Sequence, residues 1–468
     1  MENMNNKKTN TILLCDAYMH TFHRQLPKKV SYMHAYIEAR GSNLPNVNYV
    51  RPFGIQGFIK DYLEGVVIEQ WMVEEAKEVL GEVFQTHEYF NEKGFNEIIR
   101  QHGGRLPITI KAVEEGKKVG VKNVLLTVEA WDDFSWVATW IETMLLRASW
   151  YGTSVCTLSS VVKDLERKYA NLCGCEMDSF KFLDFGARSV SSHESAGIGG
   201  AAHLVNYLGT DTLEGILWAK RNYGSTANGY SVYASCHVTT TIYGKDHEID
   251  AYRHFLNDAP MDKIVSIVTD SYSHENAVRN ILGKDLKDVI LAGHAHTVIR
   301  PDSGNPVEVS LKTLQWLWED FGGEVNVRGF KVLNPKVRVL YADGLSLSTI
   351  DAMLNNITSN GFSSENIIFG MGGKLLQGVD RDTFKFACKL SHAIVDGVPT
   401  DIFKDPEGDH SKRSKAGILK LIFENGQYQT VQSHERPELK DELEVVFKDG
   451  YLMKELTFEQ IRQNAANT

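Results

Sequence analysis

Residues 297–306 read TVIRPDSGNP, and residues 337–342 read VRVLYA. Each contains a short β-branched apolar run, which is typical of a buried strand. The residues between the two runs place apolar side chains at the spacing of one helical face: Leu311, Leu314, Leu317 and Phe321. A strand, a polar loop, a helix and a second strand in this order predict two parallel strands joined by a helix.

Further apolar runs on both sides of this stretch follow the same order. Strands are expected at residues 180–185, 264–270, 288–291 and 366–369, and a second helix at residues 345–357. Because five or six such units follow one another, we expect an irregular parallel α/β barrel rather than an open sheet. This barrel is predicted to span residues 151–384.

The two ends of the chain have a different pattern. Near the N-terminus, strands are expected at residues 30–37, 107–113 and 123–128, with an amphipathic helix over residues 71–84. Near the C-terminus, Asn425-Gly426 and Asp449-Gly450 each lie between two apolar runs and predict tight hairpins. Antiparallel strands at both ends predict one α+β sandwich domain, made of residues 1–150 together with residues 385–468.

The composition excludes several classes of protein. The chain has 468 residues, of which 43% are hydrophobic and 24% charged, as in folded globular proteins. Its 50 Lys and Arg against 60 Asp and Glu give a net charge of −10, which disfavours a nucleic-acid-binding role. The most apolar region, residues 131–151, is interrupted by charged residues, so we expect no membrane span. We therefore expect a folded cytoplasmic protein.

Charged residues follow nearly every expected strand. In parallel α/β folds the ligand binds where the strands end, so these residues are candidates for a binding site. They are Arg188, Asp211, His237, Asp270, Arg300, Asp302 and Asp343. Loops after strands are polar in most proteins, but so regular a series favours a site.

The glycine cluster FGMGGK at residues 369–374 follows the last of these strands. Gly372 and Gly373 let backbone N–H groups approach an anion, and a helix that begins there adds a favourable dipole. A glycine-rich tight turn is the alternative. Basic residues follow at Arg381, Lys389, Lys404, Lys412 and Arg413. Beside the glycines, they suggest a ligand with more than one phosphate.

Two pairs of side chains suggest the rest of the chemistry. Phe185 and Arg188 offer an aromatic face and a planar cation to a flat heteroaromatic ring. His237 and Asp270 could form an oriented histidine–carboxylate pair, although a structural histidine is the alternative. These residues predict a site for a ring and phosphates in an α/β barrel.

Two other patterns bear on the phosphate site. Asp302 and Asp343 could hold Mg²⁺ through water beside the phosphates. The sequence GIGGAA at residues 197–202 lies too far beyond its strand to be a dinucleotide fingerprint, so we expect it to pack closely inside a helix. The chain contains no G-x-x-x-x-G-K-[ST] pattern, which argues against a P-loop kinase.

Several longer motifs carry a resemblance to a known family. They are DFGARSVSS (184–192), ESAGIG (194–199), GTDT (209–212), RPDSGNP (300–306), FKDP (403–406) and KRSK (412–415). In this order they are similar to the motifs of the nicotinamide phosphoribosyltransferases, which are type II phosphoribosyltransferases. The resemblance implies a barrel packed on an α/β sandwich. It also implies a pentosyltransferase that converts nicotinamide and phosphoribosyl pyrophosphate to nicotinamide mononucleotide and pyrophosphate.

The resemblance implies roles for individual residues. The family is a head-to-tail homodimer with active sites at the interface, so Phe185 and Tyr18 of the partner subunit would stack on the pyridine ring. Arg188 and Asp211 would contact the amide oxygen and nitrogen. Further substrate contacts would come from Ser266, Arg300, Asp302, Asp343, Gly372 and Gly373. Contacts to pyrophosphate would come from Arg40, Arg381, Lys389, Lys404, Lys412 and Arg413.

The resemblance further implies ATP as a co-substrate and Mg²⁺ bound through the substrate phosphates. His237 would be phosphorylated transiently by ATP, with Asp270 and Asp302 beside it. Cys236 stands where the family usually has glutamate. A nicotinate phosphoribosyltransferase and a non-catalytic binding protein on the same fold are the alternatives. Asp211 favours nicotinamide, because a carboxylate would repel nicotinate and accept a hydrogen bond from an amide.

Overall fold

The computed structural model describes residues 9–224, 228–260, 263–293, 296–408 and 413–468. The chain divides into two units. Unit 1 consists of Met1–Thr157, Trp218–Ala227 and Asp380–Thr468, and unit 2 of Leu158–Leu217 and Asn228–Val379. The segment that begins at Trp218 was not expected in the terminal domain. It belongs there because the ring of Phe53 contacts the rings of Trp218 and Tyr223, with centroids 6.1 and 5.5 Å away.

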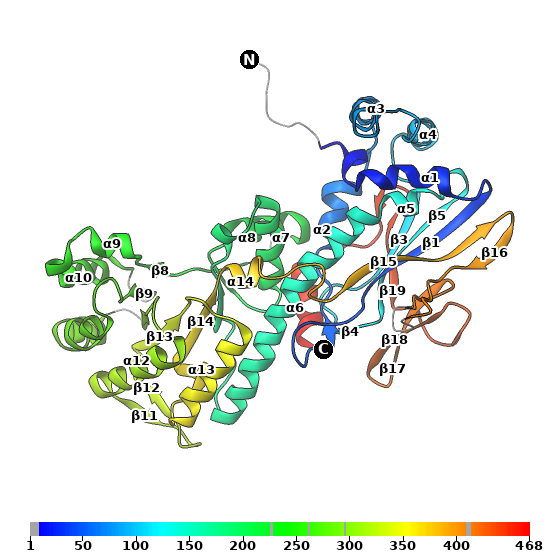
Figure 1. Cartoon of the computed structure of the whole chain (residues 1–468). Helices are drawn as coiled ribbons and strands as arrows, with labels where there is room; N and C mark the ends of the chain where they lie inside the picture. The colour runs from blue at the N-terminus through cyan, green and yellow to red at the C-terminus, as the bar shows by residue number, and fades with distance from the viewer. Residues whose placement is uncertain (1–8, 225–227, 261–262, 294–295, 409–412) are drawn as a thin grey trace, which may run out of the picture. The chain divides into compact units, whose positions relative to one another are not determined.

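Unit 2 is built on a seven-stranded parallel sheet (Figure 1). In spatial order its strands are β7 (Gly209–Thr210), β6 (Phe182–Asp184), β14 (Ile367–Met371), β13 (Val337–Tyr341), β10 (His296–Arg300), β9 (Ile264–Val268) and β8 (Tyr233–Ala234). Tyr230, which leads into β8, forms a parallel bridge with Gly209 of β7. The Tyr230 N–H donates to the Leu208 carbonyl at 2.8 Å, and Thr210 N–H donates to the Tyr230 carbonyl at 2.9 Å. This bridge joins the two edges of the sheet, so the predicted irregular parallel barrel is confirmed.

Helices follow the strands of unit 2. They are α7 (His193–Leu204), α8 (Leu213–Tyr223), α9 (His237–Thr241), α10 (Glu248–Asp258), α11 (Lys287–Ala292), α12 (Pro306–Phe321), α13 (Leu347–Ser359) and α14 (Gly373–Leu376). A π-helix, η7, spans Asn276–Asp285, and β11 (Gly323–Val325) pairs with β12 (Lys331–Leu333). The long helix α6 (Glu142–Cys173) carries the chain past residue 157.

The strand expected at residues 288–291 is wrong, because this segment lies in α11. Leu286 and Ile290 are buried one helical turn apart, and Ile290 N–H donates to the Leu286 carbonyl at 3.0 Å. A run of three apolar residues, Val289, Ile290 and Leu291, is too short for its periodicity to separate a strand from a helix.

The glycines of residues 197–202 lie inside α7, as expected for close packing. A Cβ atom on Gly200 would lie 3.0 Å from Cα of Gly215 in α8. The two helices therefore touch through glycine backbone, and this motif does not belong to a nucleotide site.

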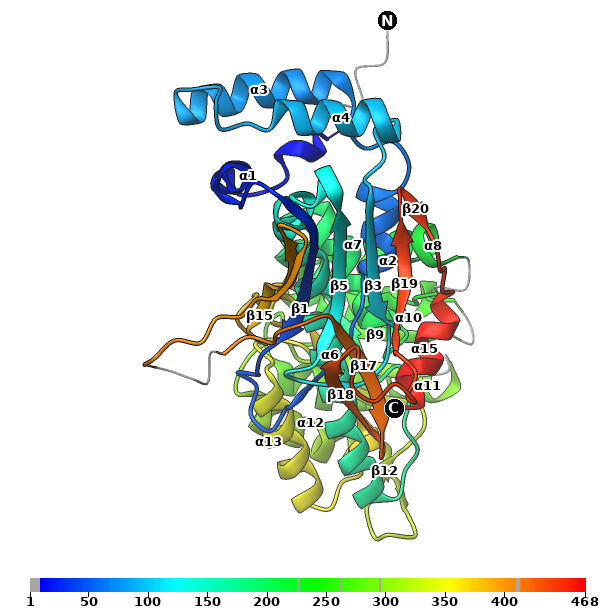
Figure 2. The same cartoon turned by 90° about the vertical axis from the view of Figure 1, so that its right-hand side faces the viewer.

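Unit 1 holds a seven-stranded antiparallel sheet (Figure 2). Its order is β16 (Val398–Asp401), β15 (Phe386–Val395), β1 (Val30–Ala39), β5 (Val124–Trp131), β3 (Ile108–Val113), β19 (Leu443–Lys448) and β20 (Tyr451–Leu452). Strand β1 lies between β15 and β5, and β19 pairs with β3. The predicted α+β domain from both ends of the chain is thus confirmed, since N-terminal and C-terminal strands share one sheet.

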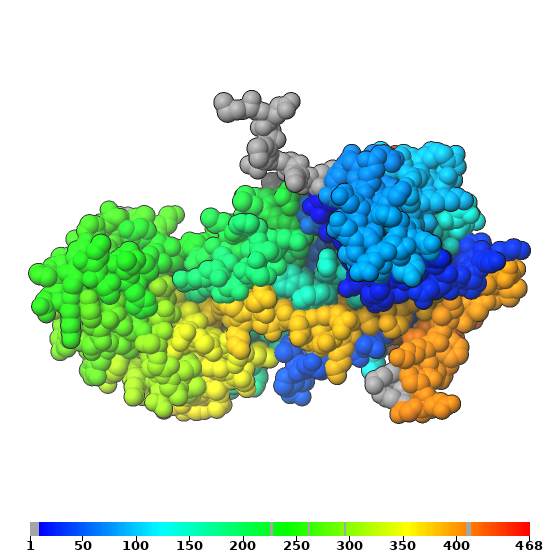
Figure 3. All heavy atoms as spheres, turned by 45° about the horizontal axis from the view of Figure 1, so that its top comes forward, coloured from blue at the N-terminus to red at the C-terminus, as the bar shows by residue number. Residues whose placement is uncertain are grey.

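Smaller elements complete unit 1. They are α1 (Phe22–Gln25), β2 (Tyr49–Val50), α2 (Ile55–Phe58), α3 (Gln70–Phe84), α4 (Glu92–His102), β4 (Val119–Gly120), α5 (Val137–Trp140), β17 (Leu419–Glu424), β18 (Gln427–Gln432) and α15 (Phe458–Ala466). In the space-filling view, the light-blue residues around α3 and α4 form a continuous surface (Figure 3).

The two expected hairpins are present. Asn425-Gly426 joins β17 to β18, and Asp449-Gly450 joins β19 to β20. All four turn residues have positive φ, from 50° to 87°, as type I′ turns require. No helix within the described ranges is long and apolar enough to cross a bilayer.

Candidate active site

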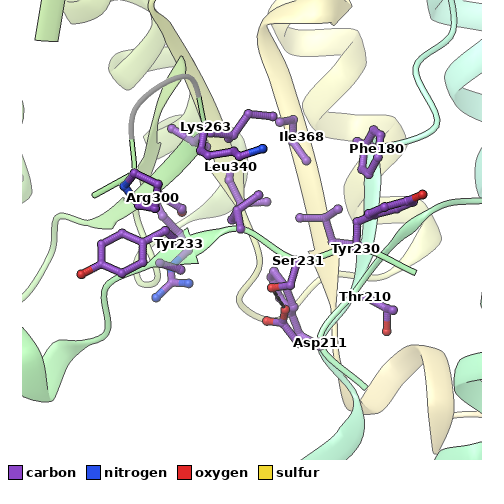
Figure 4. A pocket seen from close by; sticks show the side chains of 18 residues that line it. Phe180, Thr210, Asp211, Tyr230, Ser231, Tyr233, Lys263, Arg300, Leu340 and Ile368 are labelled. Atoms are coloured by element: carbon purple, nitrogen blue, oxygen red, sulfur yellow. Dashed lines mark hydrogen bonds between the residues drawn. The ribbon is translucent and has the colours of Figure 1, made fainter. Parts of the chain in front are cut away.

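Unit 2 contains two cavities, and residues that follow the barrel strands contribute to the lining of both. The first has a volume of about 450 Å³ and is lined largely by apolar side chains of the barrel interior, among them Leu183, Val298, Leu340 and Ile368 (Figure 4). The second has about 200 Å³ and is lined by Phe185, Ala187, Arg188, Asp211, Arg300, Asp302 and Ala342. Phe185, Asp211 and Arg300 line both cavities. These three residues therefore stand between an apolar chamber and a charged one.

Phe185 is held at this junction by the neighbouring strand. Its N–H donates to the Met371 carbonyl at 3.0 Å, and its ring lies against Gly370 of β14. A Cβ atom on Gly370 would lie 2.3 Å from the ring, so only glycine fits there. Gly370 is a structural requirement of the site that the sequence pattern did not single out from the cluster around it.

The other two glycines of the cluster shape the start of α14. A Cβ on Gly372 would lie 3.1 Å from the Phe185 carbonyl oxygen, and one on Gly373 would lie 3.3 Å from Ser189 Cβ. The backbone of the cluster therefore runs close to the loop that carries Phe185. Packing against this loop is therefore one reason for both glycines, and their role in binding an anion stays a prediction.

Asp211 is placed by the buried Asp184 at the end of β6. Asp184 is fully buried, and its carboxylate accepts hydrogen bonds from Gly186 N–H at 2.8 Å and Thr210 Oγ1 at 3.0 Å. The Asp184 carbonyl accepts the Asp211 N–H at 2.9 Å. The Asp211 carboxylate accepts a hydrogen bond from the hydroxyl of Ser231. Ser231 was not among the expected site residues.

His237 and Asp270 are brought together as expected. His237 Nε2 lies 3.0 Å from Asp270 Oδ1, and the Asp270 side chain is 7% exposed. The other carboxylate oxygen of Asp270 accepts hydrogen bonds from Ser303 Oγ and from the Asp302 N–H at 3.1 Å. Ser303 is a second residue of the site that the sequence reading missed. Asp270 thereby ties together the ends of β8, β9 and β10.

The surroundings of Asp270 and Asp302 shift the pKa values of the two carboxyl groups in opposite directions. Burial raises the pKa of Asp270, but the hydrogen bonds from Ser303, His237 and the Asp302 N–H outweigh it and hold the pKa below its ordinary value. Burial raises the pKa of Asp302, and the neighbouring Arg300 opposes this effect only in part. Asp270 is therefore the more firmly ionised of the two.

Arg300 and Ser266 leave polar atoms without partners at the cavities. Arg300 Nη2 donates to the Ser235 carbonyl at 2.9 Å. Its Nε atom and the Ser266 hydroxyl are buried and, among the described residues, have no hydrogen-bond partner. Buried polar atoms normally find partners, so both atoms fit a site that is completed by a polar ligand.

Asp302 and Asp343 are the carboxylates predicted to lie beside a metal ion that the substrate phosphates would hold. The charge of Asp343 contributes to the raised pKa of Asp302, so the two carboxylates interact. The described part of the chain contains no group of three or more His, Cys, Asp or Glu side chains able to hold a metal. Carboxylate oxygens are ligands that Mg²⁺ accepts, so the chemistry of Asp302 and Asp343 is compatible with this ion, whose binding here stays a prediction.

The remaining expected residues belong to unit 1, whereas unit 2 alone lines both cavities. Tyr18 is 58% exposed, and Arg40 donates through Nε to the Lys385 carbonyl at 3.4 Å. Arg381 pairs with Asp382 at 3.1 Å. Lys389 lies on β15. The backbone N–H of Lys404 donates to Ser414 Oγ at 2.9 Å. The guanidinium of Arg413 lies 5.2 Å from the centroid of the Phe403 ring. Lys412 lies outside the described residues.

His274 is hydrogen-bonded at the end of β9, next to Asp270, and makes the stability of the folded chain depend on pH. Its ring nitrogens share hydrogen bonds with Thr269 Oγ1 at 3.0 Å and Thr313 Oγ1 at 2.7 Å. Burial lowers the pKa of His274 to about 4. The unfolded chain, with an ordinary histidine pKa near 6.5, therefore binds a proton that the folded chain does not, and acid favours unfolding.

We expect the thermal midpoint of unfolding to fall as the pH drops from about 6.5 toward about 4. His274→Gln can replace both hydrogen bonds without titrating, so the midpoint of this variant should fall less steeply. Melting curves across this range measure the difference, with the exposed His254→Gln as the control. Equal slopes for the His274 variant and the parent chain would contradict the assignment.

Comparison with known proteins places these features in a family. Residues 180–451 match the model of the nicotinate phosphoribosyltransferase family, and residues 10–110 match the N-terminal domain of nicotinamide phosphoribosyltransferase. The nicotinamide phosphoribosyltransferase of Xanthomonas campestris pv. campestris (strain 8004) is 41% identical, over 97% of this chain and 98% of the relative. That of Acinetobacter baylyi (strain ATCC 33305 / BD413 / ADP1) is 29% identical, over 98% and 97%.

Solved structures show the same fold at low sequence identity. Nicotinate-nucleotide pyrophosphorylase from Pyrococcus furiosus is 15% identical with a TM-score of 0.64, covering 100% of this chain and 97% of that one. Human nicotinic acid phosphoribosyltransferase is 14% identical with a TM-score of 0.55, covering 97% and 93%. The resemblance inferred from the sequence motifs is confirmed. The chain belongs to the nicotinate phosphoribosyltransferase family of enzymes and carries the N-terminal domain of the nicotinamide phosphoribosyltransferases.

Proposed function

We propose that this enzyme transfers the phosphoribosyl group of phosphoribosyl pyrophosphate to nicotinamide, forming nicotinamide mononucleotide and pyrophosphate in NAD salvage. The observation that carries the proposal is the junction of the two cavities, where Phe185, Asp211 and Arg300 line both. A pyridine ring against Phe185 would have its carboxamide within the region of Asp211 and its ring nitrogen toward the charged cavity. The names of the relatives support the same reaction.

The choice of an amide over an acid is assigned to Asp211. A carboxylate accepts a hydrogen bond from an amide N–H, and it repels the carboxylate of nicotinate. Arg188 lines the charged cavity with Asp211 and would donate to the amide oxygen. The buried hydroxyl of Ser266 lines the apolar cavity and offers a further polar contact.

The reaction requires positioning and charge stabilisation more than proton transfer. The lone pair of the ring nitrogen forms a bond to C1 of the ribose as the bond from C1 to the pyrophosphate oxygen breaks. Pyrophosphate leaves with the electron pair of the broken C1–O bond. Arg300 and Asp302 would hold the phosphoribosyl group, and the backbone of Gly372 and Gly373 would hold its phosphate. Positioning of this kind can supply a large part of the rate enhancement.

Cations would bind the pyrophosphate leaving group and stabilise its negative charge. Mg²⁺, when bound through the substrate phosphates, would neutralise charge that develops on pyrophosphate. Asp302 and Asp343 would orient waters of that ion. The cationic side chains proposed to bind pyrophosphate belong to unit 1: Arg40, Arg381, Lys389, Lys404, Lys412 and Arg413.

Two further proposals rest on the family resemblance. ATP acts as a co-substrate and phosphorylates His237, whose ring Asp270 orients through the 3.0 Å contact. The enzyme is a homodimer, in which the exposed Tyr18 of the partner subunit would complete the ring site beside Phe185. Independently of the resemblance, we propose from the composition that the protein acts in the cytoplasm.

We expect Asp211→Ala to lower the preference for nicotinamide over nicotinate, because the repelling carboxylate is removed together with the acceptor for the amide. The measurement is kcat/KM for both pyridines with phosphoribosyl pyrophosphate and Mg²⁺, with the exposed Asp288→Ala as the control. The loss of one charged hydrogen bond predicts a fall of roughly tenfold or more for nicotinamide.

The same assay separates the alternatives. A parent enzyme that prefers nicotinate would be a nicotinate phosphoribosyltransferase, and a folded chain that uses neither pyridine would be a binding protein. Unchanged discrimination in the Asp211 variant would overturn the role given to this carboxylate.

A further inference from the structure

The hydrogen bond from Ser231 to Asp211 spans the seam where the barrel closes. Asp211 follows β7, and Ser231 follows Tyr230, which forms the bridge to β7. Both residues line the 450 Å³ cavity, and in Figure 4 their side chains lie beside each other at one end of it. The Ser231 hydroxyl donates to Oδ1 of the Asp211 carboxylate.

This bond is what fixes the carboxylate. The backbone of Asp211 is anchored through its N–H to Asp184, but the side chain is exposed. Within the described ranges of the chain, Ser231 provides the single hydrogen bond to the Asp211 carboxylate. With Oδ1 engaged by the hydroxyl, Oδ2 remains to accept a hydrogen bond from a ligand.

Two cationic side chains line the same cavity as this carboxylate. Arg188 and Arg300 both line the charged cavity together with Asp211. A carboxylate that is free to rotate would gain a charge-assisted pair with either guanidinium. In the described structure neither arginine is paired with Asp211, and the serine holds the carboxylate at the seam instead.

We propose that Ser231 is a specificity-determining positioning residue: by engaging Oδ1 it fixes the orientation of the Asp211 carboxylate, so that Oδ2 is presented to the carboxamide of the pyridine substrate. This inference rests on the proposed use of nicotinamide by this site. The carboxylate of Asp211 was expected to provide the discrimination alone. In this inference the discrimination also depends on the hydroxyl of Ser231, 20 residues away in the sequence. Ser231 forms no bond to the reacting atoms in this role.

The test compares Ser231→Ala with Ser231→Thr, which keeps the hydroxyl. We expect Ser231→Ala to raise KM for nicotinamide roughly tenfold, the cost of a misplaced charged hydrogen bond. The kcat value and the KM for phosphoribosyl pyrophosphate should change little, and kcat/KM for nicotinate should stay level or rise. Ser231→Thr should restore most of the preference, and the exposed Ser359→Ala on α13 is the control.

A double-mutant cycle isolates the mechanism. Because the serine acts through the carboxylate, Ser231→Ala should have no further effect on discrimination in the Asp211→Ala background. Equal losses for both pyridines, or unchanged discrimination in the Ser231→Ala variant, would overturn the inference.

The result also separates this inference from the proposed function. If the parent enzyme prefers nicotinamide and Asp211→Ala removes the preference while Ser231→Ala keeps it, the inference on Ser231 alone fails. If the parent enzyme prefers nicotinate or uses neither pyridine, the proposed function fails and this inference fails with it.

Discussion

Replacing Arg300 with alanine is expected to lower kcat/KM for nicotinamide mononucleotide synthesis by roughly 10²–10³-fold. Arg300 ends β10, lines both cavities and has a buried Nε atom without a partner. Asp211 and Arg300 are the two charged side chains that line both cavities, and Arg300 is the cation of the two. In the proposed reaction Arg300 holds the phosphoribosyl group in position for attack, and such positioning contributes more in the transition state than in the ground state, so its removal should lower kcat.

Arg300→Lys should recover only part of this loss. The ammonium group keeps the charge but has no planar fork to donate to Ser235 and a phosphate at once. The control is Arg253→Ala, since Arg253 is exposed on α10 and pairs with Asp250 at 3.0 Å. Melting curves show whether each variant is folded, and a folded Arg300→Ala enzyme with unchanged kcat/KM would contradict the assignment.

His237→Ala is expected to abolish stimulation by ATP while leaving slow synthesis without ATP. The variant lacks the imidazole that would accept the phosphoryl group, but it keeps Phe185, Asp211 and Arg300, which are proposed to contact the pyridine and phosphoribosyl groups. The measurements are the rate with and without ATP and the incorporation of label from γ-labelled ATP into the protein. Asp270→Asn should weaken stimulation less completely, because it disturbs the orientation of the ring and keeps the nucleophile.

The exposed His254→Ala is the matched control, since the His254 ring contacts Tyr243 and not the cavity residues. It should keep full stimulation by ATP and full labelling. Stimulation that survives in His237→Ala would show that another residue accepts the phosphoryl group. Loss of synthesis both with and without ATP would show that His237 acts in the transfer reaction itself.

Much of the fold was predictable because its signals are local. Alternating and continuous apolar runs, helical stripes and the two hairpin turns each depend on neighbouring residues. The helix α11 was mistaken for a strand because the expected strand contains only three apolar residues, and the turn of helix that joins Ile290 to Leu286 becomes visible only in three dimensions. The segment Trp218–Ala227 was assigned to the barrel for a similar reason, since its partner Phe53 is far away in the sequence.

The site was predictable only in part. Charged residues at strand ends could be found because parallel strands bring their ends together, and His237 and Asp270 do meet. Ser231 and Ser303 could not be found, because a serine in a loop carries no pattern of its own. Each acts through a hydrogen bond to a carboxylate 20 or 33 residues away. Gly370 could be seen as one of several glycines, but its need for zero side-chain volume comes from the Phe185 ring.

The sequence by itself determined the fold class, the family and the set of charged residues at the strand ends, because these depend on local periodicity and on contiguous motifs. The tertiary structure decided how those charges are oriented. Closure of the barrel through Tyr230 sets Ser231 against Asp211, and the strand ends set Ser303 and His237 against Asp270. Direction and protonation of a carboxylate depend on atoms a few ångströms away in space, and that spacing arises only when the sheet closes.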